Sequence, residues 1–161
     1  MSKKAFDRTD AETQKDYDRQ ARLQYDPQLV NDSIRLWNSY SKTEQDDIME
    51  QGNQIYRDIA AAIDAGEAAD SSVVQTILER WHDHMRYFYE PRLEILEGLG
   101  EMYNTDPRFM ANFEKIHPQL PAYLQQAIGQ YTDDLATVEL ERMLAEDEAI
   151  MQQRTNRLSG L

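Results

Sequence analysis

Apolar residues recur at steps of three and four along most of this chain, which places them on one face of successive helices. The pattern is densest between Trp81 and Tyr131, where aromatic residues are frequent. No segment shows the sustained alternation of apolar and polar residues that half-buried strands require. The sequence therefore predicts an all-α fold.

Local start and stop signals divide the pattern into separate helices. Ser41 followed by Glu44 is a capping box, in which each side chain accepts a hydrogen bond from the other residue's backbone N–H. Asp106-Pro107 is a cap followed by proline at the first helical position. Gly66 ends a helix because glycine tolerates the left-handed conformation. These signals predict a bundle of about six to eight helices.

The chain divides into three parts by composition. Residues 1–25 carry many charges of both signs and few apolar residues, which indicates a polar, mobile N-terminal segment. Residues 26–135 form one compact domain, as expected for a chain of 161 residues. Residues 136–161 form an acidic, helical C-terminal extension. Two alternatives stay open for this extension: it pairs two protomers into a homodimer, or it is a solvated acidic helix.

Charge and hydropathy exclude several classes of partner. The net charge is -13, so the surface repels nucleic acid and anionic lipid, and we expect no direct nucleic-acid or membrane binding. No run approaches the ~20 apolar residues that span a bilayer, and the N-terminus does not resemble a signal peptide. The chain contains no cysteine. We therefore expect a cytoplasmic protein.

The sequence shows no catalytic signal. It has no glycine-rich phosphate loop and no Ser-His-Asp arrangement, so we expect no catalytic residues, no cofactor and no enzymatic activity. Two Glu-x-x-His pairs, Glu79 with His82 and Glu114 with His117, match the spacing used in di-iron helical bundles. His82 lies beside the apolar stripe and His117 lies at a helix end, so we expect no metal site. A di-metal enzyme remains the alternative that this spacing leaves open.

Many rings with few reactive groups favour a chain that encloses an apolar ligand. Tyr87, Phe88 and Tyr89 are consecutive and cannot all face one way on a helix, so at least one ring faces away from the main core. The expected cleft would offer rings that stack on heterocycles, methionines that adapt to shape, and polar tips that donate hydrogen bonds. The same spacing also fits ordinary core packing. The candidate ligand-binding residues are Trp81, His84, Met85, Phe88, Tyr89, Leu99, Met102, Tyr103, Phe109, Phe113 and Tyr123.

Five short motifs follow one another between Tyr25 and Tyr131. They are SYSKTE at 39–44, IYRDIAAAIDAG at 55–66, HDHMRYFY at 82–89, GLGEMYNTDPRF at 98–109 and LPAYLQQAIGQY at 120–131. The fourth is long and quite specific, and the order and spacing of the others agree with it. Together they resemble the TipAS-type antibiotic-recognition domain, the ligand-binding half of certain MerR-like drug-responsive regulators.

The resemblance implies an all-α, globin-like bundle with a deep cleft for thiopeptide-like or other bulky, largely apolar antibiotics. It also implies that the N-terminal helices are mobile and close over the ligand. Two features depart from the family. Only about 25 polar residues precede the match, which leaves no room for a DNA-binding module and predicts a free-standing domain. Some members capture their ligand through a cysteine, whereas this chain has none and would bind noncovalently.

These observations predict noncovalent binding or sequestration of a bulky amphipathic small molecule. The alternative is an interaction protein, a helical adaptor that accepts a partner helix in its groove. The two hypotheses differ in whether small apolar compounds bind saturably.

Overall fold

The computed structural model describes residues 11–160, which form seven helices and contain no strand. The expected all-α bundle of about six to eight helices is therefore confirmed. The expected mobile segment at 1–25 includes residues 1–10, which lie outside the described residues, and most of the remainder forms the first helix. The helices are α1 (Ala11–Gln24), α2 (Pro27–Ser39), α3 (Lys42–Asp64), α4 (Ser72–Met85), α5 (Leu93–Tyr103), α6 (Pro107–Glu114) and α7 (Leu120–Ser159).

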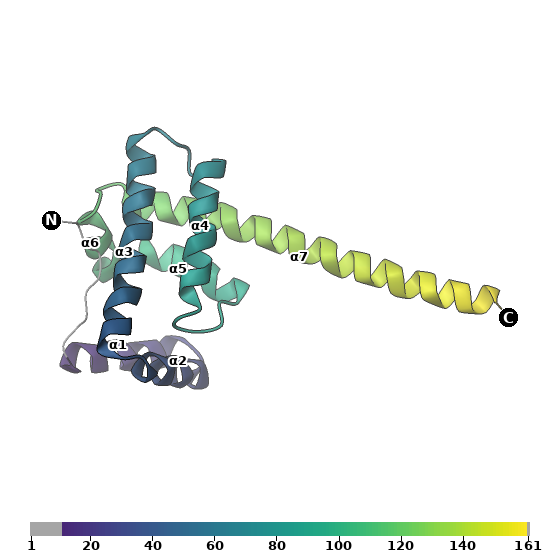
Figure 1. Cartoon of the computed structure of the whole chain (residues 1–161), viewed down its shortest axis with the longest axis horizontal. Coiled ribbons are helices and arrows are strands. Elements are labelled where there is room, and N and C mark those ends of the chain that lie inside the picture. The colour runs from purple at the N-terminus through teal and green to yellow at the C-terminus, as the bar shows by residue number, and fades with distance from the viewer. Residues whose placement is uncertain (1–10, 161) are drawn as a thin grey trace.

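The helices pack in two crossing layers. The α3 and α4 helices stand side by side, and α5 and α7 pack against each other and cross behind them (Figure 1). The α6 helix lies at one side, and α1 and α2 lie across the end of the bundle at which α3 begins (Figure 1). The two N-terminal helices contact each other but make few contacts with the other helices.

Side-chain caps fix the ends of several helices. Ser41 Oγ accepts from Glu44 N, and a Glu44 carboxylate oxygen accepts from Ser41 N, both at 3.1 Å. Asp106 Oδ1 accepts from Arg108 N at 2.9 Å at the start of α6. Gly66 has a φ of 78° just beyond α3. The predicted capping box, proline-led cap and glycine stop are all confirmed.

The core lies between α3, α4, α5, α6 and α7. Trp81 and Phe113 are fully buried in it, and the Phe113 ring meets the rings of Tyr56 and Tyr103 at centroid distances of 4.8 Å. Gly100 lets α5 approach α7 closely, because a Cβ at this position would lie 2.8 Å from Ile128 Cγ2. The close α5–α7 contact therefore depends on a glycine, which has no side chain, at position 100.

The last helix belongs only in part to the bundle. Its 40 residues span about 60 Å at 1.5 Å per residue. Its first turns are buried, as Leu124 and Ile128 show, whereas residues 137–160 are exposed and extend beyond the other helices (Figure 1). The expected division at residue 135 thus falls inside one continuous helix. Within the described range, no helix combines the length and the apolar composition needed to cross a membrane.

Candidate functional site

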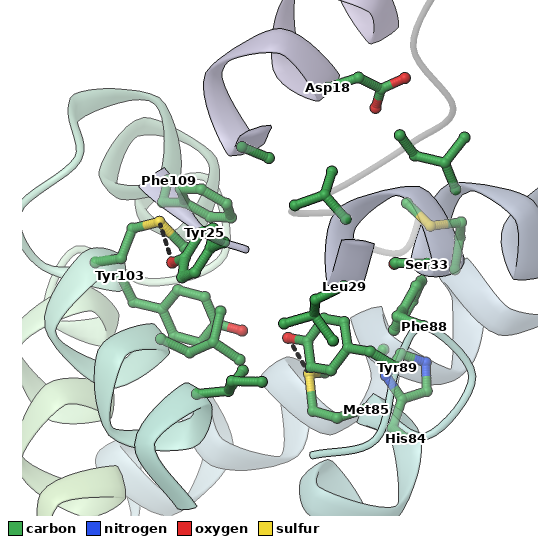
Figure 2. Close-up of a pocket in the computed structure, with 18 of the residues that line it drawn as sticks. Asp18, Tyr25, Leu29, Ser33, His84, Met85, Phe88, Tyr89, Tyr103 and Phe109 are labelled. Carbon is green, nitrogen blue, oxygen red and sulfur yellow. Dashed lines mark hydrogen bonds between the residues drawn. The ribbon is translucent and has the colours of Figure 1, made fainter. Parts of the chain in front are cut away.

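A cavity of about 410 Å³ lies where α1 and α2 face the bundle (Figure 2). Its walls come from α1, α2, α3, α5, the start of α6, and the end of α4 with the loop that follows it, and most of the groups that line it are apolar. Its volume is within the range of small-molecule sites. The lining residues are Asp18, Ala21, Tyr25, Leu29, Val30, Ser33, Ile34, Met49, Gly52, Asn53, Tyr56, His84, Met85, Phe88, Tyr89, Ile95, Leu99, Met102, Tyr103 and Phe109.

The α2 helix forms the outer wall. Asp26 caps it by accepting from Gln28 N at 2.9 Å, and Pro27 occupies its first turn. Leu29, Val30 and Ser33 then share one helical face, which is turned to the cavity. The wall is mainly aliphatic with one hydroxyl group.

Two contacts hold the C-terminal end of α2 to the loop that follows α4. The Trp37 and Phe88 rings stack with centroids 5.6 Å apart. The Tyr40 hydroxyl donates to the Tyr87 carbonyl at 2.7 Å. At the other end of α2, Tyr25 contributes one contact, from its hydroxyl to Met102 Sδ at 4.0 Å. The helix is therefore attached more firmly at its C-terminal end.

Tyrosine–methionine contacts mark both sides of the cavity. The Tyr89 hydroxyl lies 3.7 Å from Met85 Sδ, and the Tyr25 hydroxyl points at Met102 in the same way (Figure 2). Thioether sulfur is a weak acceptor, so each hydroxyl can exchange its partner for a ligand acceptor at low cost. Burial raises the pKa of Tyr89 well above its usual value, which keeps the phenol a neutral donor.

His84 provides one of the polar groups that line the cavity floor. Its Nε2 lies 2.7 Å from the Ile48 carbonyl oxygen, which can only accept, so Nε2 carries the proton. Its Nδ1 is buried and has no hydrogen-bond partner among residues 11–160. Burial lowers the pKa of His84, which favours this neutral form. A Cβ on Gly52 would lie 2.9 Å from His84 Cε1, so the imidazole fits only because Gly52 has no side chain.

Aromatic rings join the cavity to the core. Tyr103 packs against Phe109 at 5.6 Å between centroids and against Tyr56 at 6.4 Å. Burial raises the pKa of both tyrosines, so neither ionises near neutral pH. The inner wall is thus formed by rings that the core itself holds in place.

The structure brings most of the predicted site residues together. Eight of the eleven line the cavity: His84, Met85, Phe88, Tyr89, Leu99, Met102, Tyr103 and Phe109. Trp81 and Phe113 are fully buried in the core, which corrects the expectation that they line the cleft. Tyr123 is also outside the cavity, because its hydroxyl donates to the Glu67 carbonyl at 2.7 Å on the α3–α4 loop.

Sequence reasoning missed the lining residues of α1, α2 and α3. The apolar residues of α2 recur at helical spacing, and nothing in this period shows that a cavity lies behind them. Gly52 and Asn53 gave a usable signal, since they interrupt the buried stripe of α3 with a missing side chain and a buried amide. A polar interruption in an otherwise apolar face often indicates a binding surface.

The remaining histidines are engaged elsewhere. His82 Nδ1 lies 2.9 Å from the Tyr131 hydroxyl, and His117 Nε2 lies 2.9 Å from an Asp64 carboxylate oxygen. Among residues 11–160, no three His, Asp or Glu side chains form a group suited to a metal ion. Neither Glu-x-x-His pair therefore forms part of a metal-ligand cluster in this range.

A family model describes most of this architecture. The model of the TipAS antibiotic-recognition domain matches residues 17–131, from within α1 to the buried half of α7. This chain belongs to the TipAS family. The match includes α2 and most of α1, so these helices are part of the TipAS domain, while the exposed half of α7 lies outside it.

The curated relatives are transcription regulators. The chain is 32% identical over 123 residues to the HTH-type transcriptional activator mta of Bacillus subtilis, covering 76% of this chain and 47% of that protein. It is 36% identical over 94 residues to the HTH-type transcriptional activator TipA of Streptomyces coelicolor, covering 56% of this chain and 36% of that protein. The chain therefore spans about half or less of the length of these relatives.

A solved structure shares the fold. TipAS from Streptomyces lividans in complex with nosiheptide, described as part of a thiopeptide antibiotic multidrug resistance system, superposes with a TM-score of 0.70 at 28% identity. The alignment covers 81% of this chain and 90% of that one. The expectation of a globin-like, all-α TipAS fold is confirmed.

Proposed function

We propose that this TipAS domain binds a bulky, largely apolar antibiotic in the cavity between α2 and the bundle, and that it does so without chemical change to the ligand. The observation that best supports this proposal is the cavity of about 410 Å³, which is lined by aromatic rings and methionines within the region that the family model matches. The related TipAS structure contains nosiheptide, a thiopeptide, which suggests the same ligand class. The chain contains no cysteine thiol that could capture a ligand, which supports noncovalent binding.

The size of the cavity bears on how such a ligand enters. A thiopeptide is a large macrocycle, and a cavity of this volume accommodates only part of it. The α1 and α2 helices make few contacts with the rest of the bundle, so they can move outward without disturbing the core. We propose that these two helices close over the ligand, with a cost in affinity for ordering them.

The lining suggests a role for each kind of side chain. Phe88 and Phe109 would stack on heterocycles, while Met85 and Met102 would adapt to an irregular outline. The Tyr25 and Tyr89 hydroxyls would turn from methionine sulfur to ligand acceptors. Apolar contact would supply most of the affinity, and these few polar groups would set orientation.

Isothermal titration calorimetry with nosiheptide, other thiopeptides and unrelated hydrophobic antibiotics tests the proposal. We expect saturable binding of at least one compound. Ala21→Trp places an indole in the cavity and should weaken that binding at least about tenfold, since a lost apolar subsite is worth more than 1.4 kcal/mol. Ala61→Trp is the matched control, because Ala61 is exposed on α3 and does not line the cavity.

Two outcomes would contradict the proposal. Equal affinities for the wild type and Ala21→Trp would exclude this cavity as the site. A complete lack of binding across the panel, with capture of a helical protein partner, would favour the adaptor hypothesis instead.

A further inference from the structure

The exposed half of α7 carries an apolar stripe that no other part of residues 11–160 covers. Six large apolar side chains between residues 140 and 158 are each about half exposed or more. At roughly 100° per residue, all six fall within about one third of the helix circumference. We name this set the α7 stripe: Leu140, Met143, Leu144, Ile150, Met151 and Leu158.

The α7 stripe does not continue the face that packs in the bundle. Leu124, Ile128 and Thr132 define the buried face of the first half. The same helical geometry turns the stripe from that face by more than a right angle. The stripe is therefore a second apolar face on the same helix, directed away from the surface that α7 uses to hold the fold.

The spacing of the stripe is that of a paired helix. Leu144, Met151 and Leu158 are seven residues apart, and Leu140 lies four residues before Leu144, which are the steps of a coiled-coil seam. Two charged residues complete the seam, Asp147 and Arg154, and they are also seven apart. A single helix in water would gain nothing from this arrangement, whereas a second helix would bury the stripe.

The two seam charges select the orientation of that second helix. In a parallel pair of identical helices each seam residue faces its own copy, so Asp147 would meet Asp147 and Arg154 would meet Arg154. Like charges face each other in both layers, which disfavours this pairing. In an antiparallel pair with Leu140 opposite Leu158, Asp147 of one copy lies within one helical turn of Arg154 of the other.

The charges beside the seam agree with this orientation. The first part of the exposed half, residues 139–148, contains five acids and Arg142, and Arg142 already pairs with Glu139 and Glu146 on its own helix. The tip contains Arg154 and Arg157, and neither has an ion-pair partner within residues 11–160. An antiparallel pair places the tip of each helix along the acidic part of the other.

We propose that two copies of this chain associate as an antiparallel dimer through the α7 stripe. The partner is thus a second copy, and the interface comprises residues 140–158 of both chains. The two TipAS domains project from opposite ends of the paired helices and keep their cavities free, because the interface uses no cavity residue.

Sedimentation equilibrium of the full chain tests the association. We expect a dimer at micromolar concentration. Met151→Glu places a charge in the seam and should raise the dimer dissociation constant at least about tenfold. Gln153→Glu is the matched control, since it adds the same charge to the opposite face of the same helix and should change the constant less than about threefold.

Cysteine crosslinking tests the orientation, because the chain has no other cysteine. Positions 140 and 158 are about 27 Å apart along the helix, so neither Leu140→Cys nor Leu158→Cys should crosslink with itself in an antiparallel dimer. An equimolar mixture of the two variants should form the mixed disulfide under mild oxidation. Val73→Cys, exposed at the start of α4, controls for random collision when it replaces either partner.

Each result decides the proposal. A monomer at all concentrations, or a dimer that Met151→Glu and Gln153→Glu weaken equally, would overturn the interface. Efficient self-crosslinking of both single variants would show a parallel pair and overturn the orientation. Far-ultraviolet circular dichroism of each variant confirms that α7 is still helical, so a loss of association cannot be attributed to unfolding.

Discussion

At the scale of single residues, the cavity floor depends on a glycine and a histidine that require each other. His84 reaches the Ile48 carbonyl across the surface of α3, and Gly52 leaves the space in which the ring lies. The imidazole is thus both a wall of the cavity and a link between α3 and α4. We therefore expect a change at either position to affect the stability of the fold as well as binding.

Gly52→Ala should lower the free energy of unfolding by about 1–3 kcal/mol, because the new methyl group overlaps a ring that packing and a hydrogen bond hold in place. Urea denaturation measures the change. Gly129→Ala is the matched control: no atom lies within 4 Å of its added Cβ, so alanine should stabilise α7 by about 0.5–1 kcal/mol. Equal effects at the two glycines would show that His84 moves aside freely.

At the scale of helices, the sequence predicted where a helix begins and ends better than which helices pack against each other. Ser41, Glu44, Gly66 and Asp106 act within one turn of their own position, so the sequence alone identified the ends they define. Close approach between helices is different. Gly100 lies at the α5–α7 crossing, and no local signal distinguishes it from Gly98, whose added Cβ would have no atom within 4 Å.

The α5–α7 crossing gives a prediction about coupling. Gly100→Ala should destabilise the protein by about 1–3 kcal/mol, because its Cβ would meet the Ile128 side chain of α7. In the Ile128→Ala background, where that side chain is shortened, the same change should cost at least about 0.5 kcal/mol less. Thermal and urea unfolding of the four proteins of this cycle measure the coupling. Additive effects would mean that the two helices do not touch through these residues. Gly98→Ala serves as the reference, because its added Cβ meets nothing within 4 Å and alanine should stabilise α5 by about 0.5–1 kcal/mol.

At the scale of the whole molecule, the sequence predicted the fold and eight of the 20 residues that line the cavity, but not the helices that face them. Trp81 and Phe88 belong to one apolar stripe at helical spacing, yet the first is fully buried and the second stacks on Trp37 beside the cavity. Periodicity shows which face of a helix is covered and not what covers it. For this reason the spacing of Trp81 and Phe113 predicts cavity rings although both lie in the core, and it does not show the wall formed by α2.

The response of stability to pH is also a property of the whole molecule. Burial lowers the pKa values of His82 and His84, so the unfolded chain binds protons more tightly than the folded one. The stability that comes from keeping these imidazoles neutral is complete above the ordinary histidine pKa of 6.5 and is lost as pH falls below it.

This dependence is tested by measuring melting temperatures between about pH 7.5 and about pH 5, the range in which histidine takes up a proton. His84→Gln keeps a donor near the Ile48 carbonyl but cannot take up a proton, so this variant should lose less stability than the wild type as pH falls. The double variant that carries both His82→Gln and His84→Gln should lose even less stability over the same pH range. Parallel curves for all three proteins would contradict the assignment.

The firm attachment at the C-terminal end of α2 has a mechanical consequence. The helix is 13 residues long, so it acts as a lever of about 20 Å whose fulcrum lies at Trp37 and Tyr40. A tilt of about 15° about that fulcrum carries the opposite end through an arc of about 5 Å, comparable with the width of an aromatic ring. The gap between the N-terminal end of α2 and the bundle can therefore widen by the size of a ligand's side group. The contacts of Trp37 and Tyr40 and every hydrogen bond inside the helix remain intact.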